Sequence, residues 1–470
     1  MNCVVICCDT FRYDMVDHEI VETPALDRLR REGIQFTNAF AEGLPTIQAR
    51  RTMMTGVRSF PWRFEMGSRG LTPAIPGWHR VPDEQTMLSE LLIENGIVTG
   101  LVGDTYHMFK PTQNFTRGFC SWNFIRGQEA DPVRSGPLSE IDVSPYHPEG
   151  KNDLDAWSSL TQYLLNMLDR HTEEDYLTAR LFRAACRWLD ENRENSPWFL
   201  WVDSFAPHER WDPPMEFADA YYKTDKSRDY IQPQLINGRD LSEEEIERTK
   251  ALYYGYVTFV DRWIGVFLEK IESMGYMEDT GVIFTIDHGT ELWDKRRFGK
   301  GGHRLYSYNT QLPWLVRLPG GREGGSVRKD LIQHQDLLPS VCGLMDVEPN
   351  PGMEIDGRDV FDSQTESPEK AIAAWYENVS VRDEDYNMII GSTEDTEKEG
   401  ELYDLREDPE ETENLYEERP EVVKEYTEYL EGTLGPLPYE IRHTGDSRQA
   451  PPLARIYKQK GGEQEGGAYE

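Results

Sequence analysis

The chain has few basic side chains relative to acidic ones, few cysteines and no long apolar run. No segment reaches the roughly 18 consecutive apolar residues that a membrane-spanning helix needs, and the first residues lack a basic and apolar leader pattern. We therefore expect no membrane partner and a cytoplasmic location. The 85 acidic residues outnumber the 50 basic ones, which gives a formal net charge of −35. Because this charge repels polyanions, we also expect no nucleic-acid partner.

Cysteine and lysine are both scarce. Six cysteines in 470 residues do not form the dense pattern of a disulfide-stabilised domain. Cys3, Cys7 and Cys8 lie in or next to an apolar run, which indicates reduced and buried thiols. Lysine supplies only 14 of the 50 basic residues. An acidic, lysine-poor composition is typical of proteins from a high-salt cytoplasm, but an ordinary acidic bacterial protein fits equally well.

The length predicts more than one folded unit. The chain has 470 residues, 38% of them hydrophobic, and single cores stop growing at about 250–300 residues. Pro, Gly and Asp are frequent over residues 346–365, which is typical of a crossing between units. We therefore expect a large unit over residues 1–365, a small C-terminal unit over 366–435, and a polar tail of low order over 436–470.

Apolar periodicity predicts an α/β fold in which strands and helices alternate. The expected helices cover residues 23–33, 87–95, 177–192, 252–274 and the stretch after Pro420. The expected strands cover residues 4–8, 34–40, 98–102, 198–205, 282–286 and 312–318, with 371–376, 386–391 and 401–405 forming a small sheet. Residues 113–168 show no clear period. We expect them to form a surface excursion, with Trp122, Phe124 or Arg126 at the rim of a site.

Two of the apolar runs end in acidic residues. Asp9 follows the run 4–8, and Asp287 with His288 follows the run 282–286. Because ligands bind beyond the carboxyl ends of strands in parallel sheets, the two ends can meet at one cation. Carboxylates with one imidazole suit Ca²⁺, Mg²⁺, Mn²⁺ or Zn²⁺, and the residue types do not choose among them. Taken singly, each of these residues also has an ordinary structural role, such as capping a helix.

The segment 44–56, Leu-Pro-Thr-Ile-Gln-Ala-Arg-Arg-Thr-Met-Met-Thr-Gly, resembles the nucleophile motif of the sulfatase family in the alkaline phosphatase superfamily. Thr46 stands where that family has Cys or Ser. Arg50 matches the motif's arginine, and Gln48 replaces its proline. A threonine is a secondary alcohol and cannot yield the formylglycine aldehyde, so we expect no formylglycine and a Thr46 that acts as an alkoxide. A helix that begins at Thr46 would place Arg50 one turn further on the same face.

Other segments resemble motifs of the same family in the same order along the chain. Asp287-His288-Gly289 is close to the family's S-D-H-G, and Pro207-His208 is similar to its P-H-x-P. Lys300 follows at the spacing of the family's substrate-contacting lysine. His107 takes the place of the histidine in G-K-W-H, although Thr105 replaces the lysine. The stretch 402–415 resembles the L-Y-D-L-x-x-D-P-x-E-x-x-N-L signature near the end of many sulfatases.

The resemblance implies a role for each matching residue. The implied catalytic residues are Thr46, Arg50, His107, His208 and Lys300, with His208 serving the leaving group. The implied ligands of one divalent ion, Ca²⁺ in most of the family, are Asp9, Thr46, Asp287 and His288. Many members carry a second aspartate at the position of Thr10, so one ligand of the usual set is replaced here.

The resemblance also implies a fold and an activity. The fold is an alkaline-phosphatase-like sandwich: a large, mostly parallel sheet between helices, with a small C-terminal α+β subdomain that has a short antiparallel sheet. The activity is metal-dependent hydrolysis of a small anionic ester, whether a sulfate ester, a phosphodiester or a phosphonate monoester. A phosphotransferase that uses Thr46 and a non-catalytic binding protein that keeps the pocket are the alternatives. A homo-oligomer is compatible with the sequence.

Overall fold

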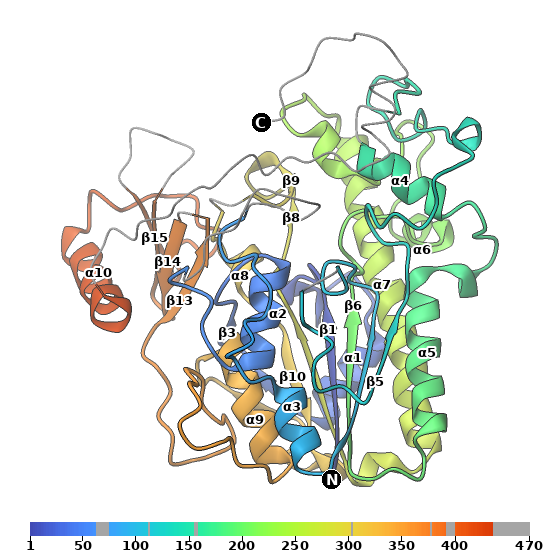
Figure 1. The fold of residues 1–470 in the computed structure, drawn as a ribbon. Helices are drawn as coiled ribbons and strands as arrows, with labels where there is room; N and C mark the ends of the chain where they lie inside the picture. Colours follow the sequence, from blue (N-terminus) through green and yellow to red (C-terminus); the bar gives the residue numbers. More distant parts are fainter. Residues whose placement is uncertain are drawn as a thin grey trace.

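A computed structural model describes residues 1–62, 75–110, 113–154, 158–301, 304–376, 378–391 and 400–435. The expected polar tail over 436–470 lies outside the described residues. Helices pack on both sides of a central sheet, and a smaller sheet with a helix of its own stands beside them (Figure 1). Among the described residues, no helix combines the length and the apolar character needed to cross a bilayer.

The central sheet has eight strands. Their bounds are β1 (Asn2–Cys8), β2 (Ile34–Phe36), β4 (Val98–Gly103), β5 (Ser121–Phe124), β6 (Trp198–Ser204), β7 (Thr280–Ile286), β10 (Trp314–Arg317) and β11 (Ser326–Arg328). The strand order is β11-β2-β10-β7-β1-β6-β4-β5. Only β10 runs antiparallel to its neighbours, β2 and β7. The expected large, mostly parallel sheet is confirmed. The expected strand over 34–40 is interrupted, because β2 ends at Phe36 and β3 (Ala39–Phe40) pairs instead with β12 (Ile332–Gln333).

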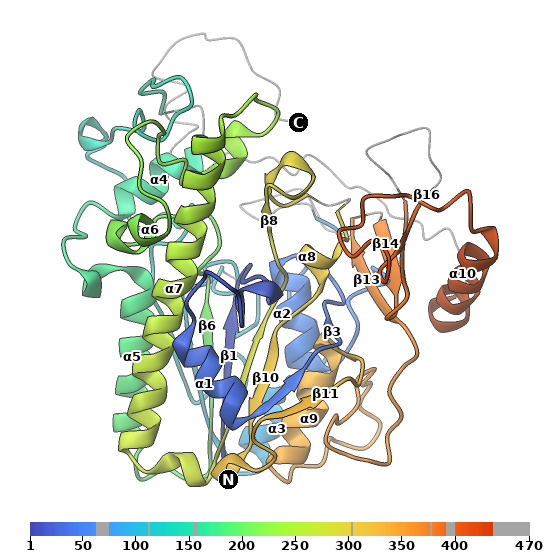
Figure 2. The same cartoon turned by 180° about the vertical axis from the view of Figure 1, so that it is seen from behind.

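Two layers of helices cover the sheet, as Figures 1 and 2 show from opposite sides. One layer contains α1 (Pro24–Glu32), α5 (Leu177–Glu191), α6 (Met215–Tyr221) and α7 (Glu243–Ser273). The other contains α2 (Thr46–Thr55), α3 (Leu88–Glu94) and α9 (Leu337–Leu344). The helix expected at 252–274 begins nine residues earlier, at Glu243, because Ser242 caps it: the Ser242 hydroxyl accepts from the Glu245 N–H and the Glu245 side chain reaches back to Ser242.

The segment 113–168 contains more regular structure than its sequence indicates. It adds β5 as an edge strand in parallel register with β4, and it ends in α4 (Ser158–Asn166). Trp122 on β5 is 55% exposed, while Phe124 stacks on Phe109 with ring centroids 4.4 Å apart. The sequence shows no alternation of apolar and polar residues here, because β5 is only four residues long and lies at an exposed edge of the sheet.

The C-terminal part forms an antiparallel sheet. Its strands are β13 (Ala371–Trp375), β14 (Asn378–Arg382), β15 (Tyr386–Ile390) and β16 (Gly400–Asp404), and α10 (Pro420–Leu434) packs on it. The sequence predicted three of these strands and missed β14. The expected short antiparallel sheet is confirmed. The sheet is joined to the segment before α2, since Leu44 N–H donates to the Ala374 carbonyl at 2.9 Å and Ala374 N–H donates to the Glu42 carbonyl at 2.8 Å.

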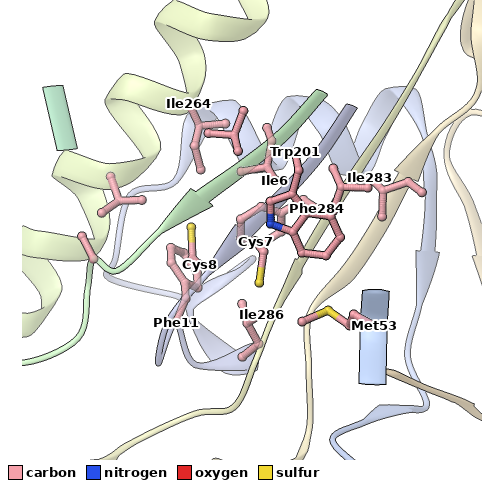
Figure 3. Close-up of a cluster of buried hydrophobic side chains, with 14 of the residues drawn as sticks. Ile6, Cys7, Cys8, Phe11, Met53, Trp201, Ile264, Ile283, Phe284 and Ile286 are labelled. Carbon is pink, nitrogen blue, oxygen red and sulfur yellow. The ribbon is translucent and has the colours of Figure 1, made fainter. Parts of the chain in front are cut away.

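The core surrounds β1, which is buried along its whole length. Ile264 of α7 lies on one side of the strands and Met53 of α2 on the other, with the side chains of β1, β6 and β7 between them (Figure 3). Parallel strands covered on both faces require apolar side chains at every position, which explains the continuous run at the start of the chain. All six cysteines are free, and burial raises the pKa of both Cys7 and Cys8. Cys7 and Cys8 are therefore inert thiols of the core.

Candidate active site

Four neighbouring strands, β7, β1, β6 and β4, deliver carboxylates to one edge of the sheet. Asp9 follows β1, Asp287 follows β7, Asp104 follows β4, and Asp203 is the next-to-last residue of β6. The backbone hydrogen bonds between neighbouring strands continue past the ends of β1 and β7. Asp9 N–H donates to the Ser204 carbonyl at 2.8 Å, and Asp287 N–H donates to the Cys8 carbonyl at 3.3 Å. All four carboxylates are fully buried. The fold therefore concentrates negative charge at this edge.

The Arg50 guanidinium lies between three of these carboxylates. Its Nη1 is 2.6 Å from Asp287 Oδ2 and 3.2 Å from Asp9 Oδ2, and its Nε donates to both oxygens of Asp203 at 3.0 Å. Burial alone would lower the pKa of Arg50, but Asp203 and Asp287 hold it well above its ordinary value. Arg50 is thus a permanently charged partner that fixes the acids.

Asp9, Asp287 and His288 offer ligand atoms that all lie within 4.8 Å of one another. Asp9 Oδ1 and His288 Nε2 are buried and have no hydrogen-bond partner among the described residues. His288 Nδ1 lies 2.7 Å from the Gly289 carbonyl, so the Nδ1 proton is held there and Nε2 keeps its lone pair. Burial lowers the pKa of His288 to about 3, which keeps the imidazole neutral. A neutral imidazole and a carboxylate with orphaned acceptor atoms are the donors that a divalent cation requires.

The pKa values of the two acids shift in opposite directions. Burial and the neighbouring Asp287 charge raise the pKa of Asp9, whereas the pKa of Asp287 is lowered despite burial, and Arg50 is the charged group in contact with it. Two buried carboxylates this close do not both ionise readily beside a single arginine. A divalent cation at this place would allow both to be charged.

Two cations face the same oxygen of Asp9. Lys300 Nζ lies 3.8 Å from Asp9 Oδ1, and His208 Nε2 lies 4.0 Å from it. Lys300 Nζ is buried without a hydrogen-bond partner among the described residues. Burial and Lys300 lower the pKa of His208, but Glu209 and Asp9 raise it further, so the net shift is upward. Lys300 and His208 are therefore placed to contact an anion bound beside Asp9.

A short hairpin carries Lys300 to the site. It is formed by β8 (Glu291–Leu292) and β9 (Phe298–Gly299). Gly299 has φ +87°, and a Cβ there would lie 2.6 Å from Gln234 Nε2, so only glycine fits immediately before the lysine. Gly289 is required for a similar reason, because a Cβ would lie 1.9 Å from the Tyr308 carbonyl oxygen. These two glycines allow the loops after β7 to pack tightly.

Thr46 is the first residue of α2, so the condition under which Arg50 would lie one turn further on the same helix face is met. It is 3% exposed. Its carbonyl accepts from Arg50 Nη1 at 3.2 Å, the same nitrogen that contacts Asp9 and Asp287. The i to i+4 spacing predicted from the sequence thus brings Thr46 and Arg50 to the acids together. The helix N-terminus supplies free N–H groups that favour an anion.

Thr10 directly follows Asp9 and adopts a left-handed conformation, with φ 58°. Its N–H donates to Asp287 Oδ1 at 3.1 Å and its carbonyl accepts from the Tyr253 hydroxyl at 2.8 Å. The backbone of Thr10 therefore helps to orient Asp287.

His107 reaches the same region from the loop after β4. Its ring contacts Phe205, with centroids 6.1 Å apart, and Phe205 stacks on His208 at 4.2 Å. His107 Nε2 lies 2.7 Å from Glu129 Oε2. Thr105, which replaces the motif's lysine, donates from its hydroxyl to Asp203 Oδ1 at 2.5 Å. The structure thus brings all the candidate residues to one edge of the sheet.

The sequence missed four acids of this site, the first of which is Asp104 after β4. Asp203 ends an apolar run just as Asp9 and Asp287 do, so the same signal could have found it. Glu209 lies next to His208, and its Oε2 is 3.0 Å from His208 Nδ1. Glu129 lies in the segment without a clear period, where no local pattern marks it.

Comparisons with known proteins identify the family. The Sulfatase family model matches residues 1–347, which is more than half of the chain. The chain belongs to the sulfatase family. A second model, described as N-sulphoglucosamine sulphohydrolase, C-terminal, matches residues 290–434. The protein is therefore a sulfuric or phosphoric ester hydrolase of the alkaline phosphatase superfamily.

The relatives of this sulfatase-family chain include an arylsulfatase, a multifunctional alkaline phosphatase superfamily protein and a phosphonate monoester hydrolase. An arylsulfatase of Clostridium perfringens is 24% identical over 92% of this chain and 93% of its own. The multifunctional alkaline phosphatase superfamily protein PehA of Trinickia caryophylli is 23% identical over 72% and 73%. The crystal structure of a phosphonate monoester hydrolase of Agrobacterium radiobacter superposes with a TM-score of 0.68 at 20% identity, covering 92% of this chain and 95% of the other. The last similarity supports the fold.

Proposed function

We propose that this protein is a metal-dependent ester hydrolase that uses the Thr46 hydroxyl as its nucleophile. The observation that carries the proposal is that three buried atoms, Asp9 Oδ1, His288 Nε2 and Lys300 Nζ, have no hydrogen-bond partner in the part of the chain that the structure describes. Arg50 Nη1 contacts both Asp9 and the Thr46 carbonyl, which brings the start of α2 to the same place. Asp9, Asp287 and His288, with the Thr46 oxygen, would hold one divalent ion. When bound, the ion supplies Lewis-acid charge that favours the alkoxide form of a hydroxyl and stabilises a charged ester oxygen.

The protein's own residues carry the remaining steps. Thr46 attacks the sulfur or phosphorus in line. Lys300 holds the developing negative charge next to Asp9, and His208, whose pKa is raised, donates its proton to the leaving oxygen. Arg50 keeps the acids in place rather than meeting the substrate, because the acids accept from its Nη1 and Nε and the Thr105 hydroxyl accepts from its Nη2. Water then cleaves the Thr46 ester.

The chemistry of the second step favours phosphorus over sulfur. A formylglycine sulfate expels its group by collapse of the hemiacetal, whereas a Thr46 ester has no such route and requires attack by water. Phosphodiesters and phosphonate monoesters fit a plain hydroxyl nucleophile, and the similarity to a phosphonate monoester hydrolase fold agrees with this choice. Transfer to an added alcohol instead of water would make the protein a phosphotransferase, which product analysis with an added acceptor distinguishes.

The Thr46 assignment is tested with paired p-nitrophenyl substrates: a sulfate, a phosphodiester and a phosphonate monoester. Thr46→Ala should lose nearly all turnover of the preferred substrate, and mass spectrometry of quenched wild-type protein should find the transferred group on the peptide with Thr46. Thr46→Ser should keep partial activity, since the hydroxyl remains and only the methyl that restricts its rotamer is lost. Near wild-type activity in Thr46→Ala would rule out the covalent mechanism.

The metal assignment is tested separately. Chelation should abolish turnover, and Asp287→Ala should lose both bound metal, measured by elemental analysis, and activity. Asp83→Ala serves as a control, because that carboxylate is 60% exposed and pairs only with Arg80 and Arg117 among the ion pairs of the described residues. Full activity of metal-free protein would refute the assignment.

A further inference from the structure

Residues 402–415 carry a signature that the proposed mechanism does not use. In the structure, two signature residues meet the side chain of Lys295, which lies in the turn of the β8–β9 hairpin. Lys295 Nζ donates to the Glu411 carbonyl, and it lies over the ring of Tyr403, 5.1 Å from the centroid. We propose that Lys295 is a positioning residue: it anchors the hairpin that carries Lys300 to the C-terminal sheet and so fixes the place of the Lys300 ammonium. The inference rests on the proposed function, in which Lys300 holds the developing charge of the ester.

Lys300 depends on its backbone for its place. Its Nζ is buried without a hydrogen-bond partner in the part of the chain that the structure describes, and it lies 3.8 Å from Asp9 Oδ1. Lys300 directly follows Gly299, the last residue of β9, which pairs with Glu291 of β8. A side chain that has no bond of its own is placed by the chain that carries it. The hairpin therefore decides where the ammonium lies.

The turn of the hairpin has a conformation that needs support. Trp293, Lys295 and Arg296 have left-handed φ values of 73°, 48° and 60°. Such values are costly for residues with side chains and persist only where the surroundings fix them. One support is Asp294, whose Oδ2 accepts from Nη1 of Arg12, in the loop after β1, at 2.5 Å. Lys295 provides another charged support, and it connects the turn to the C-terminal sheet, which lies beside the hairpin (Figure 2).

Two tyrosines form the place that receives the ammonium. The rings of Tyr306 and Tyr403 have their centroids 4.7 and 5.1 Å from Lys295 Nζ. Both hydroxyls donate to the same oxygen of Glu401, at 2.9 and 3.0 Å. This shared acceptor fixes the two rings, and the face of an aromatic ring attracts a cation. Because Lys295 precedes Lys300 along the chain and Tyr306 follows it, the contact holds the chain on both sides of Lys300.

A double-mutant cycle tests whether Lys295 acts through Lys300. Lys295→Met keeps the length of the side chain and its apolar contact with the rings, and it removes the charge and the donated bond. With the p-nitrophenyl ester that wild type cleaves fastest, Lys295→Met should lower kcat/KM at least about 10-fold, because a misplacement of about 1 Å can cost about 10²-fold. In a Lys300→Ala background the same change should cause no further loss. Lys295→Arg should keep part of the rate, since it keeps the charge and the donors.

A merely structural role for Lys295 gives a different result. Lys295→Met would then lower kcat/KM by the same factor in both backgrounds, or in neither, and either result would overturn the inference. If Lys300→Ala cleaves the ester at the wild-type rate, the role of Lys300 in the proposed function fails and the inference fails with it. If Lys300→Ala is impaired and the cycle shows no coupling, only the inference fails.

Lys370→Met is the matched control. Lys370 also lies over a tyrosine ring, 4.1 Å from the centroid of Tyr426, and its Nζ is 2.7 Å from Asp383 Oδ2. Both contacts lie within the C-terminal part and away from the hairpin in sequence. The change should therefore leave kcat/KM the same in both backgrounds.

A second variant tests the contact from the C-terminal sheet. Tyr403→Leu removes one of the two rings, and its loss in kcat/KM should again disappear in the Lys300→Ala background. All rates are measured well below the melting temperature of each variant, which circular dichroism gives, so that unfolding does not contribute. An equal loss in the two backgrounds would contradict the inference.

Discussion

At the scale of single residues, the side chain of Arg50 contacts acidic residues of the protein, whereas its motif indicates a contact with the substrate. The motif suggested an arginine that meets the substrate's charge. In the structure its side chain is fully buried and its nitrogens pair with Asp9, Asp203 and Asp287. Its importance is therefore to hold three acids together, because buried carboxylates without a cation are very costly.

Replacing Arg50 should destabilise the whole protein. Arg50→Ala removes the partner of three buried carboxylates, and we expect unfolding free energy to fall by about 3–5 kcal/mol, as for breaking a buried ion pair. Denaturation in urea measures the change. Arg30→Ala is the control, because its partner Asp17 is 61% exposed and exposed pairs contribute at most about 1 kcal/mol. Equal losses in the two variants would contradict this role of Arg50.

At the scale of elements, a side chain of the long helix α7 caps the start of α1. Asp261, buried in the middle of α7, accepts from the N–H of Ala25 at 2.9 Å and from that of Leu26 at 2.8 Å. Thr23, the residue before α1, provides no side-chain cap. The first N–H groups of α1 are therefore satisfied from another helix, which ties α1 to α7 on the same face of the sheet.

Removing this cap should destabilise the helical layer. Asp261→Ala leaves two buried N–H groups without acceptors, so we expect a loss of about 1–3 kcal/mol in unfolding free energy. Chemical denaturation followed by circular dichroism measures it. Glu269→Ala, on the exposed face of the same helix, should change stability by no more than about 0.5 kcal/mol. A neutral effect of Asp261→Ala would mean that water or a shift of α1 replaces the cap.

At the scale of the whole molecule, the C-terminal sheet supports the site. Trp375 of β13 lies beside His288, with ring centroids 5.7 Å apart. Glu411, from the signature after β16, accepts from Ser307 N–H at 2.7 Å and from Asn387 Nδ2 at 2.6 Å. The C-terminal part thus holds the chain on both sides of the site. Before Thr46, the backbone hydrogen bonds to Ala374 of β13 hold it, and after Lys300, the bond from Ser307 to Glu411 does so.

The net charge of −35 sets the expected response to salt. Screening shortens the reach of repulsion between acidic side chains to about 3 Å at 1 M salt, so we expect the melting temperature to rise from low to molar KCl. Sorbitol at the same osmolality serves as a control for effects of crowding and water activity. A melting temperature that stays flat or falls with KCl would contradict a high-salt origin and would leave the enzymatic proposal unchanged.

The sequence predicted the parts of the fold that local patterns encode. Continuous apolar runs fixed β1 and β7, and their acidic ends located Asp9 and Asp287. The sequence did not predict α2, and only the structure shows that it begins at Thr46. The prediction failed where local patterns are weak: β5 lies at an exposed edge, and β14 is recognised only through its pairing with β13 and β15.

The sequence by itself determined the fold class, because the apolar patterns that mark strands and helices depend on neighbouring residues. It also determined which candidate residues follow the predicted strands. Only the tertiary structure decided which groups face each other. Glu129 is 22 residues from His107, and Asp203 is 153 from Arg50. Such pairs form because parallel strands bring distant loops to one edge of a sheet, and their energy depends on a burial that no local pattern reports.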